Sequence, residues 1–491
     1  MNNNKVFDMD VVVAGGGVAG VSAALTAARG GLRTLLLESG SSLGGLATND
    51  YVSGIAGVVD GNCKEWMDRM AKEGYTGPRY TFDPERAKLV MESWLLEAGV
   101  RILYGVYVTD AVTVDSNIKE LVCHSKSGKM AVTAKIYIDA TGDADIAAYA
   151  GVPYEIGSPE FAGLNMSTTM GFRMANVNMK RYLEVRAAYQ KTHPNTMNIV
   201  ADLEEKAIKN GDLPYFIFPT ALIYQVPGTP ETDADITVMT THSFHTHNTD
   251  VEDLTRQIIE QHQQMQYMEK FLKKYVAGFA KARITGIASV PGVRDSRRIV
   301  GEYILKDEDI VCGRKFDDGI ARFNEFLDTH HPTSPRIGFM RHIHMSEPKE
   351  SAVCRPAQCS GDVHPFVRPG GYEARINPLN YSEIPFRVVL PLKIDNLMVV
   401  GRCVSAEFNA IAAVRVIAPA MSTGQAAGLA AGMCVKENEL PRHIDGKVIR
   451  KTMIAEGVPL DKPVIGKMAE GKGKGEFYIT SGDFIGIKEA K

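Results

Sequence analysis

The strongest constraint on the fold is a glycine-rich turn, Gly15-Gly16-Gly17-Val18-Ala19-Gly20, between a predicted strand and a predicted helix. Residues 10–14 (DVVVA) form a short continuous apolar run, which is typical of a strand buried on both faces of a parallel sheet. Residues 18–29 are rich in alanine and other small residues with good helix propensity. Residues 33–38 (RTLLLE) predict a second buried strand that ends in an acid. Together these segments predict one βαβ unit.

The spacing of the three motif glycines gives this unit a chemical role. The first glycine allows a tight turn, the second lets the backbone approach a pyrophosphate, and the third lets the helix pack closely on the sheet. The helix N-terminus directs free N–H groups and a partial positive charge at that pyrophosphate. Glu38, eighteen residues after Gly20, would accept hydrogen bonds from ribose hydroxyls and disfavour the extra phosphate of NADP. The segment therefore predicts a dinucleotide-binding site.

The rest of the chain predicts two further blocks of structure. The expected helices cover residues 84–98, 250–275 and 416–434, and the expected strands lie within 100–114, 136–140, 214–226, 235–245 and 396–400. Residues 325–380 are rich in His, Pro and Arg with little periodicity, which indicates ordered loops. We expect an α/β fold: a Rossmann-type domain from residues 1–165 and 380–440, an inserted α+β substrate domain at 166–379, and a C-terminal extension at 441–491.

Composition excludes several classes of protein. With 491 residues, 45% of them hydrophobic, the chain can bury a large core and is not disordered. A formal charge of −3, with basic residues spread along the chain, gives no support for nucleic-acid binding. No segment reaches the roughly 18 apolar residues of a membrane-spanning helix. The N-terminus shows no signal pattern, and seven scattered cysteines suit a reducing compartment, so we expect a cytoplasmic protein.

Several further motifs carry a family resemblance. They are LGGLAT at 43–48, ATGDAD at 140–145, GVRDSRRIVGEYIL at 292–305, IPFRVVLP at 384–391, and a late strand followed by Gly401-Arg402 and a closing helix. With the glycine turn, this set resembles the FAD-dependent oxidoreductases of the glutathione-reductase-like superfamily, in the branch that includes fumarate reductase flavoproteins. The resemblance covers nearly the whole chain and implies FAD as the cofactor.

The resemblance also implies which residues contact FAD. Gly15, Gly17 and Gly20 would hold the pyrophosphate, Glu38 the adenosine ribose, and Val108 would offer backbone to adenine. The helix that starts near Val416 would direct its positive end at the flavin N1 and C2 carbonyl, where a reduced flavin is negative. The full predicted set is Gly15, Gly17, Ala19, Gly20, Glu38, Ser39, Gly44, Gly45, Leu46, Val108, Ala140, Thr141, Gly142, Asp143, Gly401, Arg402, Val416 and Ile417.

The attachment of the flavin and its electron partner are further expectations. Several fumarate reductase relatives hold flavin covalently through a histidine just after the double glycine, but residues 44–57 contain no histidine, so we expect non-covalent FAD. The chain lacks C-x-x-C-H haem motifs. Electrons would therefore pass to or from a soluble carrier, NAD(P)H or oxygen. The sequence leaves open whether copies of the chain form a homo-oligomer.

Arginine and histidine residues supply the candidates for substrate chemistry. Arg294, Arg297 and Arg298 would share one face of a helix, where they would either bind a substrate carboxylate or form a structural network with Asp295 and Glu302. The predicted catalytic set is Arg298, His342, His344, Arg387 and Arg415, with Arg341 and His364 near it in the His-rich loops. His242, His245 and His247 follow a strand pattern in which only the last two share a face, and no metal site is predicted.

These features predict an enzyme that transfers a hydride between flavin N5 and a small polar organic substrate, of which a carboxylate is one candidate. Two alternatives remain at this stage. One is an oxidase or monooxygenase that uses oxygen. The other is a flavin-binding assembly protein without catalytic activity, against which the cluster of Arg and His residues argues.

Overall fold

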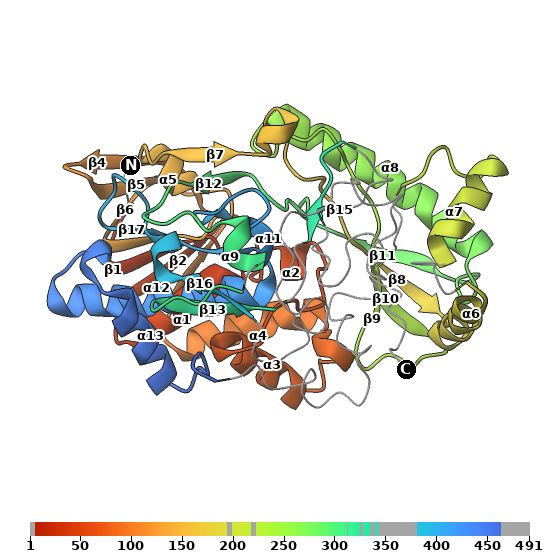
Figure 1. Ribbon diagram of the computed structural model, residues 1–491, viewed down its shortest axis with the longest axis horizontal. Helices are drawn as coiled ribbons and strands as arrows, with labels where there is room; N and C mark the ends of the chain where they lie inside the picture. The colour runs from red at the N-terminus through yellow and green to blue at the C-terminus, as the bar shows by residue number, and fades with distance from the viewer. Residues whose placement is uncertain are drawn as a thin grey trace.

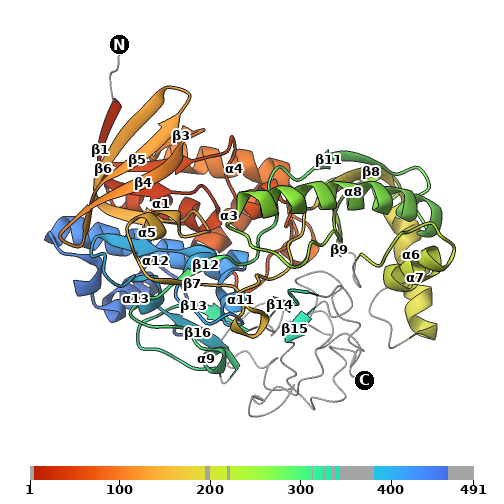
Figure 2. The ribbon, with the colours of Figure 1, turned by 90° about the horizontal axis from the view of Figure 1, so that it is seen from above.

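The computed structural model describes residues 5–193, 199–217, 222–311, 313–324, 328–333, 339–341 and 381–462. Within these residues the chain forms two main sheets, each with its own helices. Figure 1 shows the larger sheet with helices α1, α3, α4 and α12 on the left, and a smaller sheet with α6, α7 and α8 on the right. Figure 2 shows the same division from above.

The larger sheet has seven strands in the order β3-β2-β1-β6-β5-β4, with β17 paired to β6. Its strands are β1 (Lys5–Ala14), β2 (Thr34–Glu38), β3 (Arg101–Tyr104), β4 (Tyr107–Val114), β5 (Asn117–Ser125), β6 (Gly128–Asp139) and β17 (Leu397–Val399). Strands β3, β2, β1, β6 and β17 are parallel, whereas β4, β5 and β6 are joined as antiparallel neighbours. This parallel sheet with its crossover helix α1 confirms the predicted α/β, Rossmann-type fold.

Alternating side chains of β1 serve two separate cores. Val11 and Val13 pack in the core that contains α1 and α12, whereas Val12 and Ala14 pack on the opposite face of the sheet. A central strand with both faces covered needs apolar side chains at every position, which explains the continuous run that the sequence shows. Strand β1 begins at Lys5, earlier than residue 10, because Lys5 already pairs with Met130 of β6.

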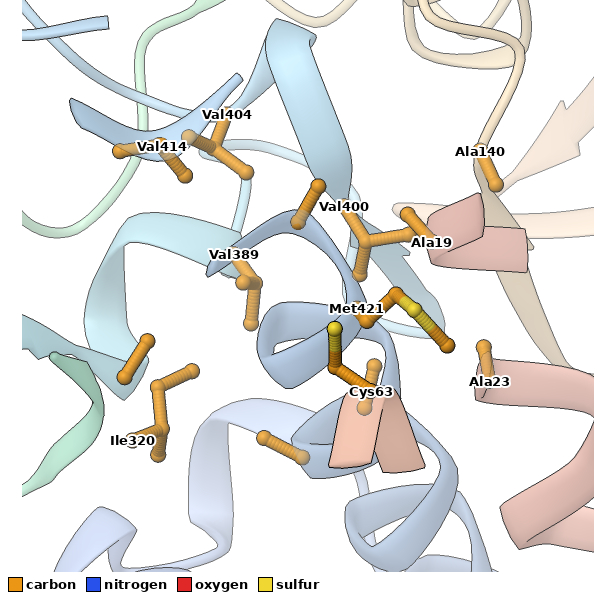
Figure 3. Packing of buried hydrophobic residues seen from close by; sticks show 14 of the residues in the cluster. Ala19, Ala23, Cys63, Ala140, Ile320, Val389, Val400, Val404, Val414 and Met421 are labelled. Carbon is orange, nitrogen blue, oxygen red and sulfur yellow. The ribbon is translucent and has the colours of Figure 1, made fainter. Parts of the chain in front are cut away.

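Helices α1 (Val18–Arg29) and α12 (Ile417–Glu437) pack against each other across glycines. A Cβ at Gly424 would lie 2.1 Å from the carbonyl oxygen of Ala19, so the two backbones touch where a side chain would not fit. Figure 3 shows Met421 of α12 beside Ala19 and Ala23 of α1 and near Cys63 of α3. This packing fixes the N-termini of both helices relative to the sheet. The other helices of this part are α2 (Leu46–Asn49), α3 (Gly61–Lys72), α4 (Pro84–Glu97), α5 (Asp145–Tyr149), α9 (Asp307–Val311), α11 (Ile411–Val414) and α13 (Gly446–Ala455).

The smaller sheet has four antiparallel strands in the order β11-β8-β10-β9. They are β8 (Phe172–Val177), β9 (Leu222–Gln225), β10 (Ala234–Met239) and β11 (Arg283–Ile287), and the associated helices are α6 (Met179–Thr192), α7 (Ile199–Lys209) and α8 (Val251–Tyr275). Met265, Met268 and Phe271 of α8 share one core with Phe172 and Val238 of the sheet. The described residues also form three short strand pairs: β7 (Tyr154–Ile156) with β12 (Arg297–Ile299), β13 (Gly319–Phe323) with β16 (Ser382–Pro385), and β14 (Thr329–His330) with β15 (Phe339–Arg341).

The structure corrects three expectations about local structure. Residues 294–298 do not form a helix, because they run as an extended segment into β12, which pairs with β7. The predicted strand at 235–245 ends at Met239, and the three histidines at 242–247 lie beyond it, His245 with a positive φ of 55°. The strand predicted within 214–226 is limited to β9 among the described residues.

Candidate functional site

A cavity of about 570 Å³ lies where the carboxyl ends of β1, β2 and β6 meet the smaller sheet. Ligands of open α/β sheets bind at this edge, beyond the carboxyl ends of the strands. Of the eighteen residues predicted to contact FAD, all but Gly20 line the cavity, together with Val18, Asn49, Tyr107 and Ala420. The opposite wall consists of residues from the smaller sheet and its loops, which include Thr169, Leu222, Tyr224, Met239, His242, Val293 and Arg294.

The three motif glycines occupy three different environments. Gly15 has φ of 101°, and a Cβ there would lie 2.2 Å from the carbonyl oxygen of Ala140. Gly20 lies behind the cavity, where a Cβ would be 1.9 Å from the Gly15 carbonyl oxygen, so it permits the contact of α1 with the sheet. Gly17 has an ordinary φ of −65°, and the nearest atom to a Cβ there is 4.0 Å away. A methyl group at Gly17 would therefore occupy the cavity without a clash with the protein.

Glu38 closes the turn at the end of β2. Its Oε2 accepts a hydrogen bond from Gly16 N–H at 2.6 Å, and its Oε1 accepts one from Gly40 N–H at 2.6 Å. Each carboxylate oxygen can accept a further bond. Glu38 thus orders the glycine loop and still presents acceptors to the cavity that it lines.

Two helix N-termini face this cavity without capping side chains. Helix α1 begins after Gly17 and helix α12 after Val416, and neither has a side-chain cap or an acidic residue in its first turn. Uncapped N-termini present N–H groups and a partial positive charge. The cavity therefore offers two places for negative groups, one at the glycine turn and one at the far end beside Arg415. This pair suits a dinucleotide with a pyrophosphate in its middle and a partly negative ring at one end.

A cluster of charged and polar side chains lies along one wall of the cavity. The Arg402 guanidinium lies 2.8 Å from Asp143 Oδ1, and Ser296 Oγ donates to the same oxygen at 2.5 Å. Arg297 donates to the Asp143 carbonyl at 2.9 Å and pairs with Asp145 at 2.8 Å. Arg402 is thus held in place by Asp143 while it lines the cavity beside Gly401.

Arg294 contributes a partly buried charge to the wall opposite the glycine turn. Its Nη1 donates to the Ser167 carbonyl at 2.5 Å, and its Nη2 donates to Thr169 Oγ1 at 2.8 Å. Burial and the charge of Arg415 lower the pKa of Arg294 to about 10, which leaves it fully charged at neutral pH. Both acceptors are neutral. Among the described residues no carboxylate oxygen lies within 4.0 Å of this guanidinium.

Asp328, His330 and Arg415 form a second charged group in the same cavity. Arg415 Nη2 donates to the Asp328 carbonyl at 2.5 Å and lies 3.4 Å from Oδ2, and His330 Nε2 lies 3.1 Å from Oδ1. Burial opposes ionisation of Asp328, but the contact with His330 and the charges of Arg415 and Arg294 lower its pKa well below the ordinary value. Burial and the charge of Arg294 lower the pKa of His330 to about 4, so its imidazole is neutral.

His242 and Asp50 are two further buried groups of the cavity. The two ring nitrogens of His242 lie 3.4 and 3.5 Å from Thr169 Oγ1, and its ring stacks on His330 with centroids 5.6 Å apart. Burial, with the charge of Arg294, lowers the pKa of His242 well below its ordinary value. Asp50 Oδ1 accepts from Gly171 N–H at 2.8 Å, and burial raises the pKa of Asp50 well above its ordinary value. This end of the cavity thus combines two guanidinium groups, the carboxyl groups of Asp50 and Asp328, and two neutral imidazoles.

The structure brings together only part of the predicted catalytic set. Arg415 lines the cavity. Arg298 is buried away from it, where it donates to the carbonyls of Ala406 and Gly157 and lies 3.6 Å from Asp295. Arg387 pairs with Asp318 at 2.9 Å and also lies outside the cavity lining. Both arginines therefore support the surrounding structure. His342, His344 and His364 lie outside the described residues, as does the side chain of Arg341.

Sequence reasoning did not select Asp50, Thr169, His242, Asp328 or His330 for the site. His242 was considered only for a metal site, and among the described residues no group of three or more His, Cys, Asp and Glu side chains is arranged to hold a metal. In the structure Thr169 precedes β8 and His242 follows β10, so both lie just beyond the ends of strands. The sequence predicted no strand at β8, and it placed His242 inside the strand expected at 235–245. The neighbouring strand of each one could not be inferred from the sequence.

Comparison with known proteins tests the predicted family. The model of the FAD dependent oxidoreductase family matches residues 10–453. The chain belongs to this family. It is therefore an enzyme that uses FAD, which confirms the predicted cofactor and removes the alternative of a flavin-binding protein without catalytic activity. The closer relation to fumarate reductase flavoproteins stays a prediction.

Individual relatives are distant. The chain is 30% identical over 146 residues to a thiamine thiazole synthase from Methanothermobacter thermautotrophicus, which covers 28% of this chain and 57% of that protein. A thiamine thiazole synthase from Sulfolobus acidocaldarius is also 30% identical, over 158 residues that cover 29% and 58%. The chain thus spans a little over half the length of these relatives. A geranylgeranyl bacteriochlorophyll reductase-like protein from Thermoplasma acidophilum is 14% identical with a TM-score of 0.40, over 92% of this chain and 84% of that one.

Members of this FAD-dependent family need a site for the whole dinucleotide, and the residues present fit one. Gly17 leaves the cavity open at the turn, two uncapped helix N-termini face it, and Arg402, paired with Asp143, lines the wall. Among the described helices, none has the length and apolarity required to span a bilayer.

Proposed function

We propose that this enzyme is a dehydrogenase or reductase that transfers a hydride between flavin N5 and a small organic carboxylate bound at Arg294 and Arg415. Bound FAD supplies the hydride chemistry at N5. We propose that it is held non-covalently by the predicted cofactor residues, with the pyrophosphate at Gly15, Gly17 and the α1 N-terminus.

The observation that carries this proposal is the partly buried charge of Arg294. Its hydrogen bonds go to Ser167 O and Thr169 Oγ1, which are both neutral, and the group lines the cavity. Arg294 and Arg415 share the charge of one ionised carboxylate, Asp328. Positive charge in excess of its counter-ion costs free energy in a partly buried site, and an anionic ligand would reduce that cost. Guanidinium groups bind carboxylates through two parallel hydrogen bonds, so a carboxylate is the anion that we propose.

The neutral groups around Arg294 can move the proton that accompanies hydride transfer. His242 lies on the cavity wall against Thr169 with its imidazole uncharged, so a ring nitrogen can accept a proton from the substrate or from a hydroxyl next to it. We propose His242 as this group. The charge of Arg294 opposes protonation of His242, and a bound carboxylate would reduce that opposition. Substrate binding and proton acceptance would thus be coupled.

Spectroscopy tests each part of the proposal. The absorbance of purified protein is recorded before and after acid precipitation, which releases FAD to the supernatant if the cofactor is not covalent. The enzyme is then mixed anaerobically with NADH and with small acids, amines and alcohols, and dithionite-reduced enzyme is mixed with unsaturated acids. We expect a carboxylate to bleach the oxidised flavin or to reoxidise the reduced one. Bleaching by neutral amines or alcohols alone would overturn the carboxylate assignment.

A pair of arginine variants locates the anion. For Arg294→Met, we expect the carboxylate concentration for half-maximal spectral change to rise roughly tenfold to a hundredfold, because a hydrogen bond to a charged group contributes about 1.5–3 kcal/mol. Arg283→Met, which removes an exposed arginine of β11, is the control and should leave that concentration unchanged. If both variants behave like the wild type, Arg294 does not bind the substrate. Rapid reoxidation in air would identify oxygen as the electron acceptor.

A further inference from the structure

Helix α8 buries three glutamine side chains on one face. Gln257, Gln261 and Gln264 follow each other at helical spacing, and all three are almost fully buried. A buried amide must find partners for its donors and its acceptor, since an unsatisfied group costs about 1–3 kcal/mol. The partners of these glutamines therefore show what this face of α8 supports.

The first two glutamines hold the two chain segments that lead to the cavity. Thr168 Oγ1 donates to Gln257 Oε1 at 2.7 Å and accepts from Gln261 Nε2 at 3.1 Å. Thr241 Oγ1 lies 3.0 Å from Gln261 Oε1 and accepts from the Met170 N–H at 2.9 Å. The segment before β8 and the segment after β10 are thus tied to the same helix.

Gln264 makes a two-pronged contact with the backbone of His242. Its Oε1 accepts from His242 N–H at 2.7 Å, and its Nε2 donates to the His242 carbonyl at 2.7 Å. The next residue, Ser243, exchanges both of its backbone hydrogen bonds with Thr168 on the other side, each at 3.1 Å. Successive residues of an extended strand direct their backbone groups to opposite sides. The amide of Gln264 therefore takes the place of a neighbouring strand at His242.

This contact determines where the imidazole of His242 lies. With its backbone held by Gln264, the His242 side chain lines the cavity, where Thr169, Arg294 and His330 face its ring. The one acidic group near the contact is Glu260 of α8, whose oxygens lie 3.4 Å from Gln264 Nε2 and 2.8 Å from Ser243 Oγ, among the described residues.

We propose that Gln264 is a positioning residue, whose amide fixes the backbone of His242 so that the imidazole stays against Thr169 and Arg294. The inference rests on the proposed function, in which His242 moves the proton. Misplacement of a reacting group by about 1 Å can cost roughly a hundredfold in rate. Gln264 itself touches neither the cavity nor the proposed ligand.

Three variants test this role. Gln264→Leu removes both hydrogen bonds to His242 at similar volume, together with the contacts of Gln264 with Glu260 and Tyr215. Gln264→Glu keeps the acceptor for His242 N–H and loses the donor to the His242 carbonyl, and only its protonated carboxyl can restore that donor. Gln263→Leu, at the exposed neighbour on α8, is the control. The first readout is the NMR signal of the His242 ring in histidine-labelled holoenzyme, assigned with His242→Gln. The second is the rate of flavin reduction or reoxidation by the active compound of the spectroscopic panel.

For Gln264→Leu we expect a displaced His242 ring signal that titrates nearer to the ordinary histidine range, and a rate lower by about tenfold or more. The rate and the His242 signal of Gln264→Glu, each compared with the wild type at the same pH, should approach the wild type as the pH is lowered, because the carboxyl then takes up a proton. Gln263→Leu should match the wild type in both readouts. If Gln264→Leu proves unfolded, the recovery of Gln264→Glu on acidification still decides the question.

Two results separate the inference from the function on which it rests. An unchanged His242 signal in Gln264→Leu, or a Gln264→Glu enzyme that does not recover at low pH, would overturn the positioning role even if His242 is essential. A displaced signal with an unchanged rate would keep the positioning role and overturn His242 as the proton-transfer group.

Discussion

The contrast between Gly17 and Gly20 makes the proposed pyrophosphate site directly testable. In Gly17→Ala the new methyl group would meet the protein only in van der Waals contact, since the nearest atom is Gly45 Cα at 4.0 Å, and the backbone at φ −65° and ψ 173° accepts alanine without strain. In Gly20→Ala the methyl would lie 1.9 Å from the Gly15 carbonyl oxygen, so α1 would have to move away from the sheet. The two variants add the same group three residues apart on opposite sides of the turn.

We expect the two substitutions to affect different properties. Alanine at position 17 lowers the entropy of the unfolded chain but is less favourable than glycine at a helix N-cap. Because these two effects oppose each other, the free energy of unfolding of the apoprotein should change by no more than about 1 kcal/mol. That corresponds to about 2 °C or less in Tm for a chain of this size. Its methyl would fill space that the cofactor needs, and overpacking costs about 1–3 kcal/mol, or roughly 5- to 150-fold in the Kd for FAD. Gly20→Ala should instead destabilise the apoprotein itself by 1–3 kcal/mol or more.

The assay is a pair of measurements on flavin-free protein: thermal unfolding without FAD, and a fluorescence titration with FAD. An unchanged Kd in Gly17→Ala would refute the placement of the cofactor at this turn. A fall of many degrees in the apoprotein Tm of Gly17→Ala would instead show that Gly17 serves the fold.

Two further predictions concern stability. Arg322 donates from Nε and Nη2 to buried Asp60 at 3.0 and 2.5 Å. Arg322→Met should therefore lower the free energy of unfolding by about 3–5 kcal/mol, and the double variant with Asp60→Leu should recover part of that loss. Thermal unfolding of the two variants checks this. Burial raises the pKa of Asp139 to about 6, although Thr141 and Ala147 donate hydrogen bonds to it. Because the folded state then holds a proton that the unfolded state has already released, the wild type should lose up to about 3 kcal/mol of stability between about pH 4 and pH 6. Urea unfolding across this range should show the decline in the wild type and no such decline in Asp139→Asn. Identical pH profiles for the two proteins would contradict the prediction.

The cofactor half of the protein could be predicted from the sequence because its signals are local. The strand at β1, the glycine turn, helix α1 and Glu38 lie within 34 consecutive residues, and each acts on its neighbours in the chain. Glycine at positions 15 and 20 is required by contacts inside this unit and at Ala140, which follows β6 directly. Helix α12 was also predictable, because its many small residues indicate close packing against another element even when that element has not been identified.

The substrate half depended on contacts that the sequence does not encode locally. Arg294 was expected on a helix with Arg297 and Arg298, but the segment is extended because β12 pairs with β7. As a result Arg294 lines the cavity, Arg297 pairs with Asp145, and Arg298 lies in the interior. The spacing of the arginines carried no information about that pairing. His242 likewise looked like one of three loosely grouped histidines.

The sequence by itself determined the family, the cofactor and the βαβ unit that faces it, because short-range sterics and backbone hydrogen bonding specify a glycine turn between a strand and a helix. Only the tertiary structure decided that Arg294, His242, His330 and Arg415 meet in one cavity. These residues come from four separate segments, and their meeting depends on strand pairing, on the glutamines of α8 and on the packing of α12 against α1. Burial then sets their charges, because the same histidine or arginine would titrate normally on an exposed loop.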